Sequence, residues 1–206
     1  MTLPKGIEWL YPQQDPQVMQ VVEAYLRKYY DDTRPRQLMF GINPGRHGAG
    51  ITGVNFTAAR QLTQVCGIDH PFKSGTELSA EFIYDMIGAY GGAAGFYSRF
   101  FISSVCPLGF VQNGRNLNYY DDKALLETVT PFITGSIGQL LDHNRVDRSV
   151  VYCIGGEKNF KYFSGWNEAN GWFDTIIPLA HPRYIMQYRR KEKEQFIREY
   201  LRLMAH

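Results

Sequence analysis

Four runs of mainly apolar residues stand out along the chain, at residues 36–42, 99–105, 149–156 and 173–180. Each run is short and lacks the strict apolar–polar alternation of a strand that faces water on one side. Near-continuous apolar runs of this length are typical of strands buried on both faces, as in a parallel sheet. The pattern therefore predicts four buried strands.

The segments between these runs are predicted to be mostly helical. Asp15 followed by Pro16 is typical of a helix N-cap and first turn. Pro131 is expected to bend or divide a long helix. Residues 107–120 are interpreted as a loop. The expected helices cover 16–30, 57–67, 77–92, 121–144, 157–166 and 189–205. Strands that alternate with helices predict an α/β fold. We expect a three-layer α/β/α sandwich with a central four-stranded, mostly parallel sheet, formed as a single domain by residues 1–206.

Polar side chains mark the ends of three predicted strands. The first strand ends at Asn43, directly before a proline; the second ends with Ser104 shortly before a Cys-Pro pair; and the fourth ends at His181, again before a proline. Proline fixes the exit path of the chain and holds the preceding residue extended. Because ligands of parallel sheets bind beyond the carboxyl ends of the strands, we expect these three side chains to share one crevice.

The composition bears on the cellular compartment of the protein and on the presence of metal sites. The three cysteines, Cys66, Cys106 and Cys153, are isolated and odd in number, which favours a reducing compartment over a disulfide framework. Their spacing also lacks a metal-binding pair, so we expect no structural metal site. The first residues lack the apolar core of a signal peptide, and no apolar run approaches the roughly 20 residues that span a membrane. We therefore expect a cytoplasmic protein without a membrane partner.

Charge is unevenly distributed although the net charge is only +2. Residues 183–202 hold seven basic against three acidic residues, which gives this segment +4 and the remainder −2. A basic end on a nearly neutral protein can bind phosphate, and Arg183, Arg189 and Arg190 are the candidates nearest the His-Pro pair. A solvated helix of mixed charge explains the same pattern from charge alone.

A glycine-rich stretch, GAGITG, raises a second possibility for the site. Its glycines, Gly48, Gly50 and Gly53, satisfy the dinucleotide-binding pattern GxGxxG. That fingerprint requires the glycines directly at a strand-to-helix turn, whereas residues 43–47 intervene here. A Rossmann-like nucleotide-binding enzyme therefore remains an alternative function for this protein. Titration with NAD would test it.

Several of these segments together resemble a known family. GINPGRHGAGITGVNF, FFISSVCPLGFVQNGRNL, ELSAEFIY and LAHPRY are similar to the motifs of the uracil-DNA glycosylase superfamily. The nearest pattern is that of its single-strand-selective monofunctional family, which reads GMNPG, TGVPF, NLCPL, SGRNL and His-Pro. The resemblance covers about residues 36–190, and the combination of PLxF with GRNL is its most specific part.

The resemblance implies a role for individual residues. Asn43 would hold the water that attacks the sugar C1′, and His181 would donate a hydrogen bond to a base carbonyl as negative charge builds on the leaving base. Phe56 would stack on the flipped base, and Gly45 would let the backbone approach it closely. His47, in the same loop, is expected among the base-binding residues.

Two departures from the family pattern affect specificity. Ser104 stands where the family has an asparagine that reads both a donor and an acceptor of uracil, so we expect weaker uracil readout and a larger pocket. The family follows His-Pro with a loop that wedges the duplex, and here Arg183 and Tyr184 occupy that segment beside Arg189 and Arg190.

The sequence thus predicts a monofunctional DNA glycosylase of base excision repair that excises uracil, xanthine-type purines or both. We expect no metal and no organic cofactor, because such an enzyme only has to position water and stabilise the leaving anion. It would act as a monomer on single- or double-stranded DNA, at the nucleoid if the source is a bacterium. A nucleic-acid-binding module that kept the fold and lost the chemistry is a further alternative, against which the presence of both Asn43 and His181 argues.

Overall fold

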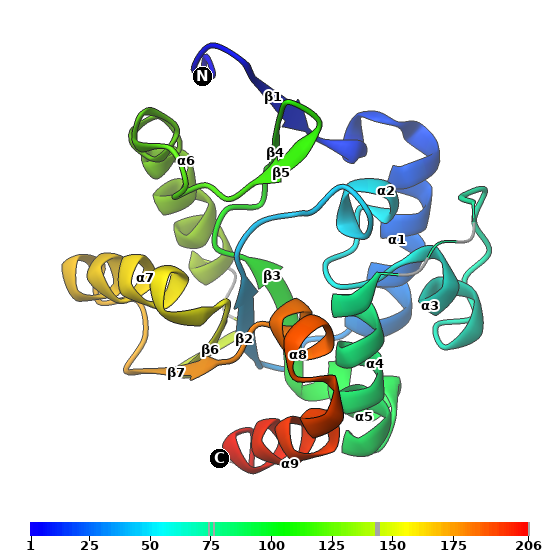
Figure 1. Ribbon diagram of the computed structural model, residues 1–206. Helices are drawn as coiled ribbons and strands as arrows, with labels where there is room; N and C mark the ends of the chain where they lie inside the picture. The colour runs from blue at the N-terminus through cyan, green and yellow to red at the C-terminus, as the bar shows by residue number, and fades with distance from the viewer. Residues whose placement is uncertain (74, 76, 143–144, 206) are drawn as a thin grey trace.

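The computed structural model describes residues 1–73, 75, 77–142 and 145–205. Its centre is a four-stranded sheet in the order β3-β2-β6-β7, and every neighbouring pair is parallel (Figure 1). The strands are β2 (Arg36–Gly41), β3 (Phe100–Ser104), β6 (Val146–Ile154) and β7 (Thr175–Leu179). The predicted α/β sandwich with a four-stranded parallel sheet is confirmed. The prediction that all four strands are buried is wrong for the edge strand β7, where only Leu179 is buried, and for the partly exposed first half of β6.

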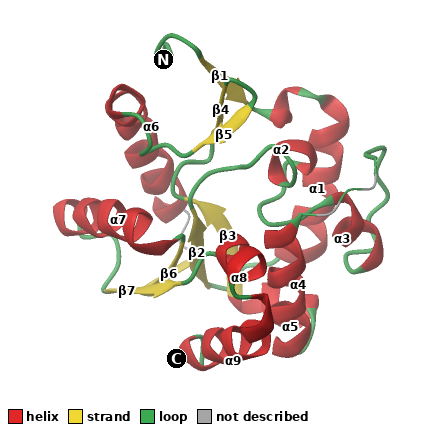
Figure 2. Cartoon of the chain, viewed as in Figure 1, coloured by secondary structure: helices red, strands yellow, loops and turns green. Residues whose placement is uncertain are grey.

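Helices cover both faces of this sheet (Figure 2). Two of them pack on one face: α6 (Lys123–Asp142) and α7 (Gly156–Asn170). The other face is covered mainly by α1 (Pro16–Tyr30), α4 (Leu78–Tyr90), α5 (Ala93–Arg99), α8 (Pro182–Tyr188) and α9 (Lys193–Leu203). Along β2 the side chains alternate between the two cores, with Met39 on the α4 side and Leu38 and Phe40 on the α6 side. Since both faces are buried here, three consecutive residues, Leu38 to Phe40, are apolar, which produces the continuous run in the sequence.

A second, smaller sheet is a feature that the sequence interpretation missed. Three antiparallel strands form it in the order β1-β4-β5: β1 (Ile7–Leu10), β4 (Gly109–Gln112) and β5 (Arg115–Leu117). The interpretation of residues 107–120 as a loop is therefore wrong. Asn113 and Gly114 connect β4 to β5 with φ of 49° and 72°, the conformation of a two-residue hairpin turn that favours Asn-Gly.

Helix boundaries differ from the prediction at several places. The segment expected as a closing helix over 189–205 instead comprises Arg189, which caps the end of α8, the short 3₁₀ helix η2 (Arg190–Glu192) and α9. The short helices α2 (Ala49–Thr52), α5 and the 3₁₀ helix η1 (Pro12–Gln14) were not predicted, and α3 (Ala59–Gln64) is shorter than expected. Helix α6 continues through Pro131, while the last two residues predicted for it, 143–144, lie outside the described residues.

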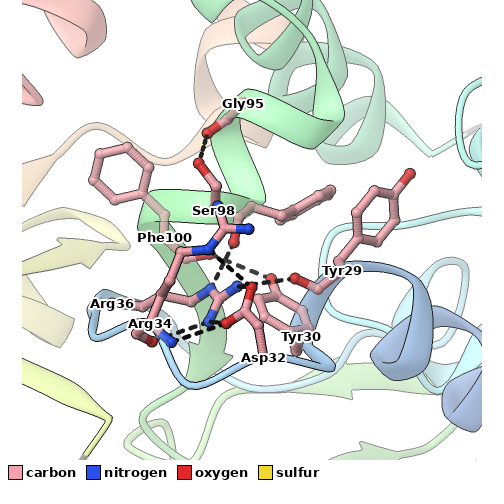
Figure 3. Close-up of polar contacts among 9 residues, drawn as sticks. Tyr29, Tyr30, Asp32, Arg34, Arg36, Gly95, Ser98 and Phe100 are labelled. Carbon is pink, nitrogen blue, oxygen red and sulfur yellow. Dashed lines mark hydrogen bonds and ion pairs between the residues drawn. The ribbon is translucent and has the colours of Figure 1, made fainter.

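The amino end of β2, opposite the predicted crevice, is fixed by a buried arginine (Figure 3). The Arg36 guanidinium donates to both carboxylate oxygens of Asp32 at 2.8 and 2.9 Å, to the Tyr97 carbonyl at 2.7 Å and to the Tyr29 carbonyl at 3.0 Å. A fifth bond, to the Arg34 carbonyl at 3.1 Å, uses its remaining donor. These bonds hold the pKa of the Asp32 carboxyl below its usual value and tie the ends of α1 and α5 to the sheet.

Candidate functional site

A cavity of about 560 Å³ lies at the carboxyl edge of the four-stranded sheet. Residues at or just beyond the carboxyl ends of all four strands contribute to its wall, together with α8 and the β4–β5 hairpin. All but two of the residues predicted for the site line this cavity: Asn43, Gly45, His47, Phe56, Ser104, His181, Arg183 and Tyr184. Side chains that are far apart in the sequence, such as Asn43 and His181, are thus brought to one place, as expected for residues at the ends of parallel strands.

Asn43 follows β2 and is fixed by the backbone that leaves β5. Its Nδ2 donates to the Leu117 carbonyl at 3.2 Å, and its Oδ1 accepts from the Tyr119 backbone N–H at 3.1 Å. These bonds determine which way the amide faces. Because a carbonyl oxygen has two lone pairs, Oδ1 retains one that can accept a hydrogen bond from a water molecule in the cavity.

The segment that holds Asn43 is itself anchored in the core. The Tyr119 side chain is completely buried, and its hydroxyl donates to Oδ1 of the buried Asn159 on α7 at 2.8 Å. Asn159 Nδ2 in turn donates to the Cys153 Sγ at 3.3 Å. Burial raises the pKa of the Tyr119 phenol, so the hydroxyl keeps its proton and remains a donor. This chain of bonds connects the cavity to the β6–α7 side of the core.

Phe56 lies in the loop after α2 with an unusual backbone. Its φ is 52°, a left-handed value that non-glycine residues seldom adopt and that is enriched at functional sites. The ring lies directly against the last residue of β2, since a Cβ on Gly41 would stand only 2.8 Å from Phe56 Cε2. Glycine at position 41 therefore lets the aromatic face rest on the strand end. The centroids of the Phe56 and His181 rings are 6.4 Å apart.

His181 follows β7 and caps α8. Its Nδ1 accepts from the Arg183 backbone N–H at 3.0 Å, so Nε2 carries the proton of the neutral ring and can donate. Burial, and then the positive charge of Arg183, lower the pKa of His181 to about 4. The Tyr200 hydroxyl donates to the Ala180 carbonyl and fixes the chain just before the histidine. At neutral pH the site therefore presents an uncharged imidazole with one fixed donor.

Ser104, at the end of β3, contacts a residue that the sequence analysis did not select. Its hydroxyl donates to Asn55 Oδ1 at 2.8 Å, and the Ser104 side chain is almost completely buried. Both residues line the cavity. The sequence carries a signal for Asn55, because this chain reads TGVNF where the family motif reads TGVPF.

Aromatic and basic side chains form the rim of the cavity. Tyr184 and Tyr188 on α8 are 46% and 68% exposed, and their ring centroids are 5.8 Å apart. On the other side, Arg46 and Arg115 also line the cavity, and neither was predicted. Arg46 donates to the Gly114 carbonyl and, through Nε, to His47 Nε2 at 3.0 Å.

The two remaining predicted DNA-binding residues lie outside the cavity wall. Arg189 forms an ion pair with Glu192, and Arg190 lies 3.9 Å from a carboxylate oxygen of Glu81. Their positive charge is therefore partly compensated within the protein, whereas Arg183 lines the cavity directly.

The glycine-rich stretch does not have the geometry of a dinucleotide site. Strand β2 ends at Gly41, and Gly48 caps the four-residue helix α2 rather than a helix that starts at the strand. Gly53 ends α2 with φ of 72°. The strand–turn–helix arrangement that the GxGxxG fingerprint requires is thus not formed by these residues.

Two other features of the described residues bear on function. In the described part of the chain, no three His, Cys, Asp or Glu side chains group as they would to hold a metal ion. Among the same residues, no helix is both long enough and apolar enough to cross a membrane.

The fold and the cavity define a class of protein. A parallel α/β sandwich with Asn43, Phe56 and His181 around one cavity has the layout that the sequence motifs imply for a DNA glycosylase. The model of the uracil DNA glycosylase superfamily matches residues 27–205, and the chain belongs to this superfamily. It is therefore a DNA glycosylase whose partner is DNA.

Among solved structures, the crystal structure of wild-type SMUG2 from Pedobacter heparinus is similar to this chain. The sequences are 43% identical, the match covers 98% of this chain and 88% of the other, and the TM-score is 0.94. A comparison with curated proteins found no match. The family resemblance read from the sequence motifs is confirmed.

Proposed function

We propose that this DNA glycosylase is monofunctional and hydrolyses the N-glycosidic bond of deaminated bases, namely uracil and xanthine-type purines, in base excision repair. The observation that carries the proposal is the convergence of Asn43, Phe56 and His181 on one cavity, with the imidazole neutral and its donor free to face a ligand. A duplex hides the glycosidic bond, so the target nucleotide must be extruded into this cavity.

Binding and departure of the base involve Phe56 and His181. The Phe56 ring offers a flat apolar face for stacking. Because the ring lies against Gly41, its distance from the end of β2 is fixed. As the C1′–N bond breaks, its electron pair stays on the base, and the His181 Nε2–H donates to a base carbonyl that gains negative charge. A donor that is already oriented needs no reorganisation during the reaction, which favours the transition state over the bound substrate.

Asn43 is suited to place the water that completes the hydrolysis. Its Oδ1 accepts from the Tyr119 backbone N–H and has one lone pair left for water. The water oxygen forms the new bond to C1′ and loses a proton to solvent, and the departing base anion takes up a proton. An amide can orient this water without adding charge beside the electron-poor sugar.

The cavity wall supports a hydrolytic rather than a lyase reaction. A glycosylase that also cuts the strand forms a Schiff base and needs an amine nucleophile. Among the described residues that line the cavity, none is a lysine. Water is then the expected nucleophile.

The substrate range rests on the size of the cavity and on Ser104. A volume of about 560 Å³ lies within the range of roughly 300–1,000 Å³ typical of small-molecule sites and leaves room for a two-ring base. Uracil and xanthine share a ring N–H flanked by two carbonyls, so both can present a carbonyl to His181.

The test uses single-stranded oligonucleotides, each with one uracil, xanthine or hypoxanthine. We expect strand cleavage at uracil and xanthine after alkali and none before it. His181→Ala should lower the single-turnover rate by about 10²–10³-fold, the scale for loss of one donor to a developing anion. Cleavage without alkali, or trapping of the enzyme on DNA by borohydride, would refute the monofunctional assignment. A mutant with wild-type turnover would remove His181 from the mechanism.

A further inference from the structure

The contact between Ser104 and Asn55 has a consequence for base recognition. The Ser104 hydroxyl donates to Asn55 Oδ1 at 2.8 Å, which uses the serine proton and orients the asparagine amide. The Asn55 Nδ2 group forms no hydrogen bond with any described residue, although Asn55 lines the cavity. The pair therefore presents two kinds of group to a ligand: the N–H donors of Asn55 and the lone pairs of Ser104 Oγ.

We propose that Asn55 and Ser104 act together as one base-reading edge, with Asn55 Nδ2 donating to a base carbonyl and Ser104 Oγ accepting from the adjacent ring N–H. This inference rests on the proposed function, since it assigns the substrate class of that same cavity. The hydroxyl and the amide, taken together, supply the donor and the acceptor that a single asparagine side chain would supply.

Such an edge selects the chemical change that deamination produces. Cytosine and adenine each carry an exocyclic amino donor beside a ring nitrogen that accepts. Deamination turns the amino group into a carbonyl and the neighbouring ring nitrogen into an N–H, which reverses both positions. A donor from Asn55 and an acceptor from Ser104 match uracil and hypoxanthine, whereas cytosine and adenine would place donor against donor. A buried mismatch of this kind leaves polar groups unpaired and is strongly rejected.

The loop that carries Asn55 is fixed before any ligand binds. Thr52 Oγ1 donates to the Thr57 carbonyl at 2.7 Å and accepts from the Val54 N–H at 3.2 Å. Thr57 Oγ1 donates to the Asn55 carbonyl at 3.1 Å, which fixes the Asn55 backbone itself. The next residue is Phe56, so one rigid loop carries both the stacking face and the amide. A recognition group held in this way loses little entropy on binding.

The position of the pair also fits with His181. Ser104 ends β3 at one edge of the sheet, and His181 follows β7 at the other edge. A base between them would meet a donor from His181 on one side and the Asn55–Ser104 pair on the other. Uracil and xanthine each offer a carbonyl to both sides, while hypoxanthine offers one only to the pair.

The experiment measures base discrimination by binding, which does not require turnover. The probes are single-stranded oligonucleotides with one 2′-fluoroarabino nucleotide, which resists hydrolysis, carrying either uracil or cytosine. Wild-type protein should bind the uracil probe at least about 10-fold more tightly than the cytosine probe, the scale for one buried unpaired group. In Asn55→Ala this ratio should fall to about 3 or less.

Two further variants separate recognition from folding. Asn55→Ala with Ser104→Asn moves the amide to β3 and should restore the preference for uracil, because one asparagine can supply both groups. A rescued ratio cannot come from a misfolded protein. Asn170→Ala is the matched control. This exposed asparagine lies at the end of α7, it does not line the cavity, and among the described residues its side chain bonds only to the Trp166 carbonyl. It should keep the wild-type ratio.

The outcomes separate this inference from the proposed function. If the wild type excises deaminated bases and Asn55→Ala keeps the full uracil ratio, the base-reading pair is refuted and the proposed function stands. If no base is excised but the ratio is high and falls in Asn55→Ala, the pair stands and the proposed function is refuted. A wild type that prefers the cytosine probe, or has no preference, also overturns the inference.

Discussion

Replacing His181 with Asn tests whether the folded protein keeps this imidazole uncharged. An asparagine can still cap α8 by accepting from the Arg183 N–H, but it cannot titrate. In the wild type, the folded protein binds the imidazole proton with a pKa of about 4, against an ordinary value of 6.5. The unfolded chain therefore holds more protons throughout this window, and the free energy of unfolding falls as the pH falls.

The size of the effect follows from the pKa shift. At 1.36 kcal/mol per pKa unit, the shift from 6.5 to about 4 costs the wild type about 3 kcal/mol between pH 7 and pH 4. Carboxylates such as Asp32, whose pKa is lowered by Arg36, titrate in both proteins and cancel in the comparison. Urea unfolding of both proteins at several pH values measures the difference. Curves that fall in parallel would show that the folded protein binds a proton at His181 normally.

Three further predictions concern the cavity. Asn43→Ala should bind DNA as the wild type does but excise bases at least about 100-fold more slowly, because water placement is lost; equal rates would remove Asn43 from the reaction. Gly41→Ala places a methyl group 2.8 Å from the Phe56 ring, so the ring must shift. Single-turnover rates should fall about 10–100-fold with little loss of stability. Unchanged rates would show that Phe56 does not determine the position of the base. Duplex binding should weaken with salt at a log–log slope of about −0.9 per phosphate contact, and Arg183→Ala should flatten this slope more than Arg189→Ala, since Arg189 is paired with Glu192. Equal slopes would show that the cavity rim does not contact phosphate.

Much of the site could be predicted because it depends on strand ends. The apolar runs determine where β2, β3 and β7 stop, and a parallel sheet places those ends on one edge. Asn43, Ser104 and His181 are found together for this reason. Their conformations could not be predicted: the neutral tautomer of His181 depends on its bond to the Arg183 N–H, and the orientation of Asn43 depends on the backbone of residues 117–119.

The features that were missed depend on contacts between distant segments. The β4–β5 hairpin carries an Asn113-Gly114 turn signal, but its strands are too short for a clear alternating pattern, and its pairing with β1 joins segments about 100 residues apart. Asn55 meets Ser104 only because the loop after α2 folds back over the sheet. Helix α8 had a recognisable start in His181-Pro182, which matches an N-cap with proline in the first turn.

We propose above all that the cavity is the place where the bond between a deaminated base and its sugar is hydrolysed. The most direct measurement is chromatography of the bases released from uracil- and xanthine-containing oligonucleotides, alongside alkali-labile sites in the same samples. We expect free uracil and free xanthine in amounts equal to the alkali-labile sites, and strong reduction of both in Asn43→Ala and His181→Ala. Intact oligonucleotides with no free base, under conditions where the protein binds the same strands, would contradict it.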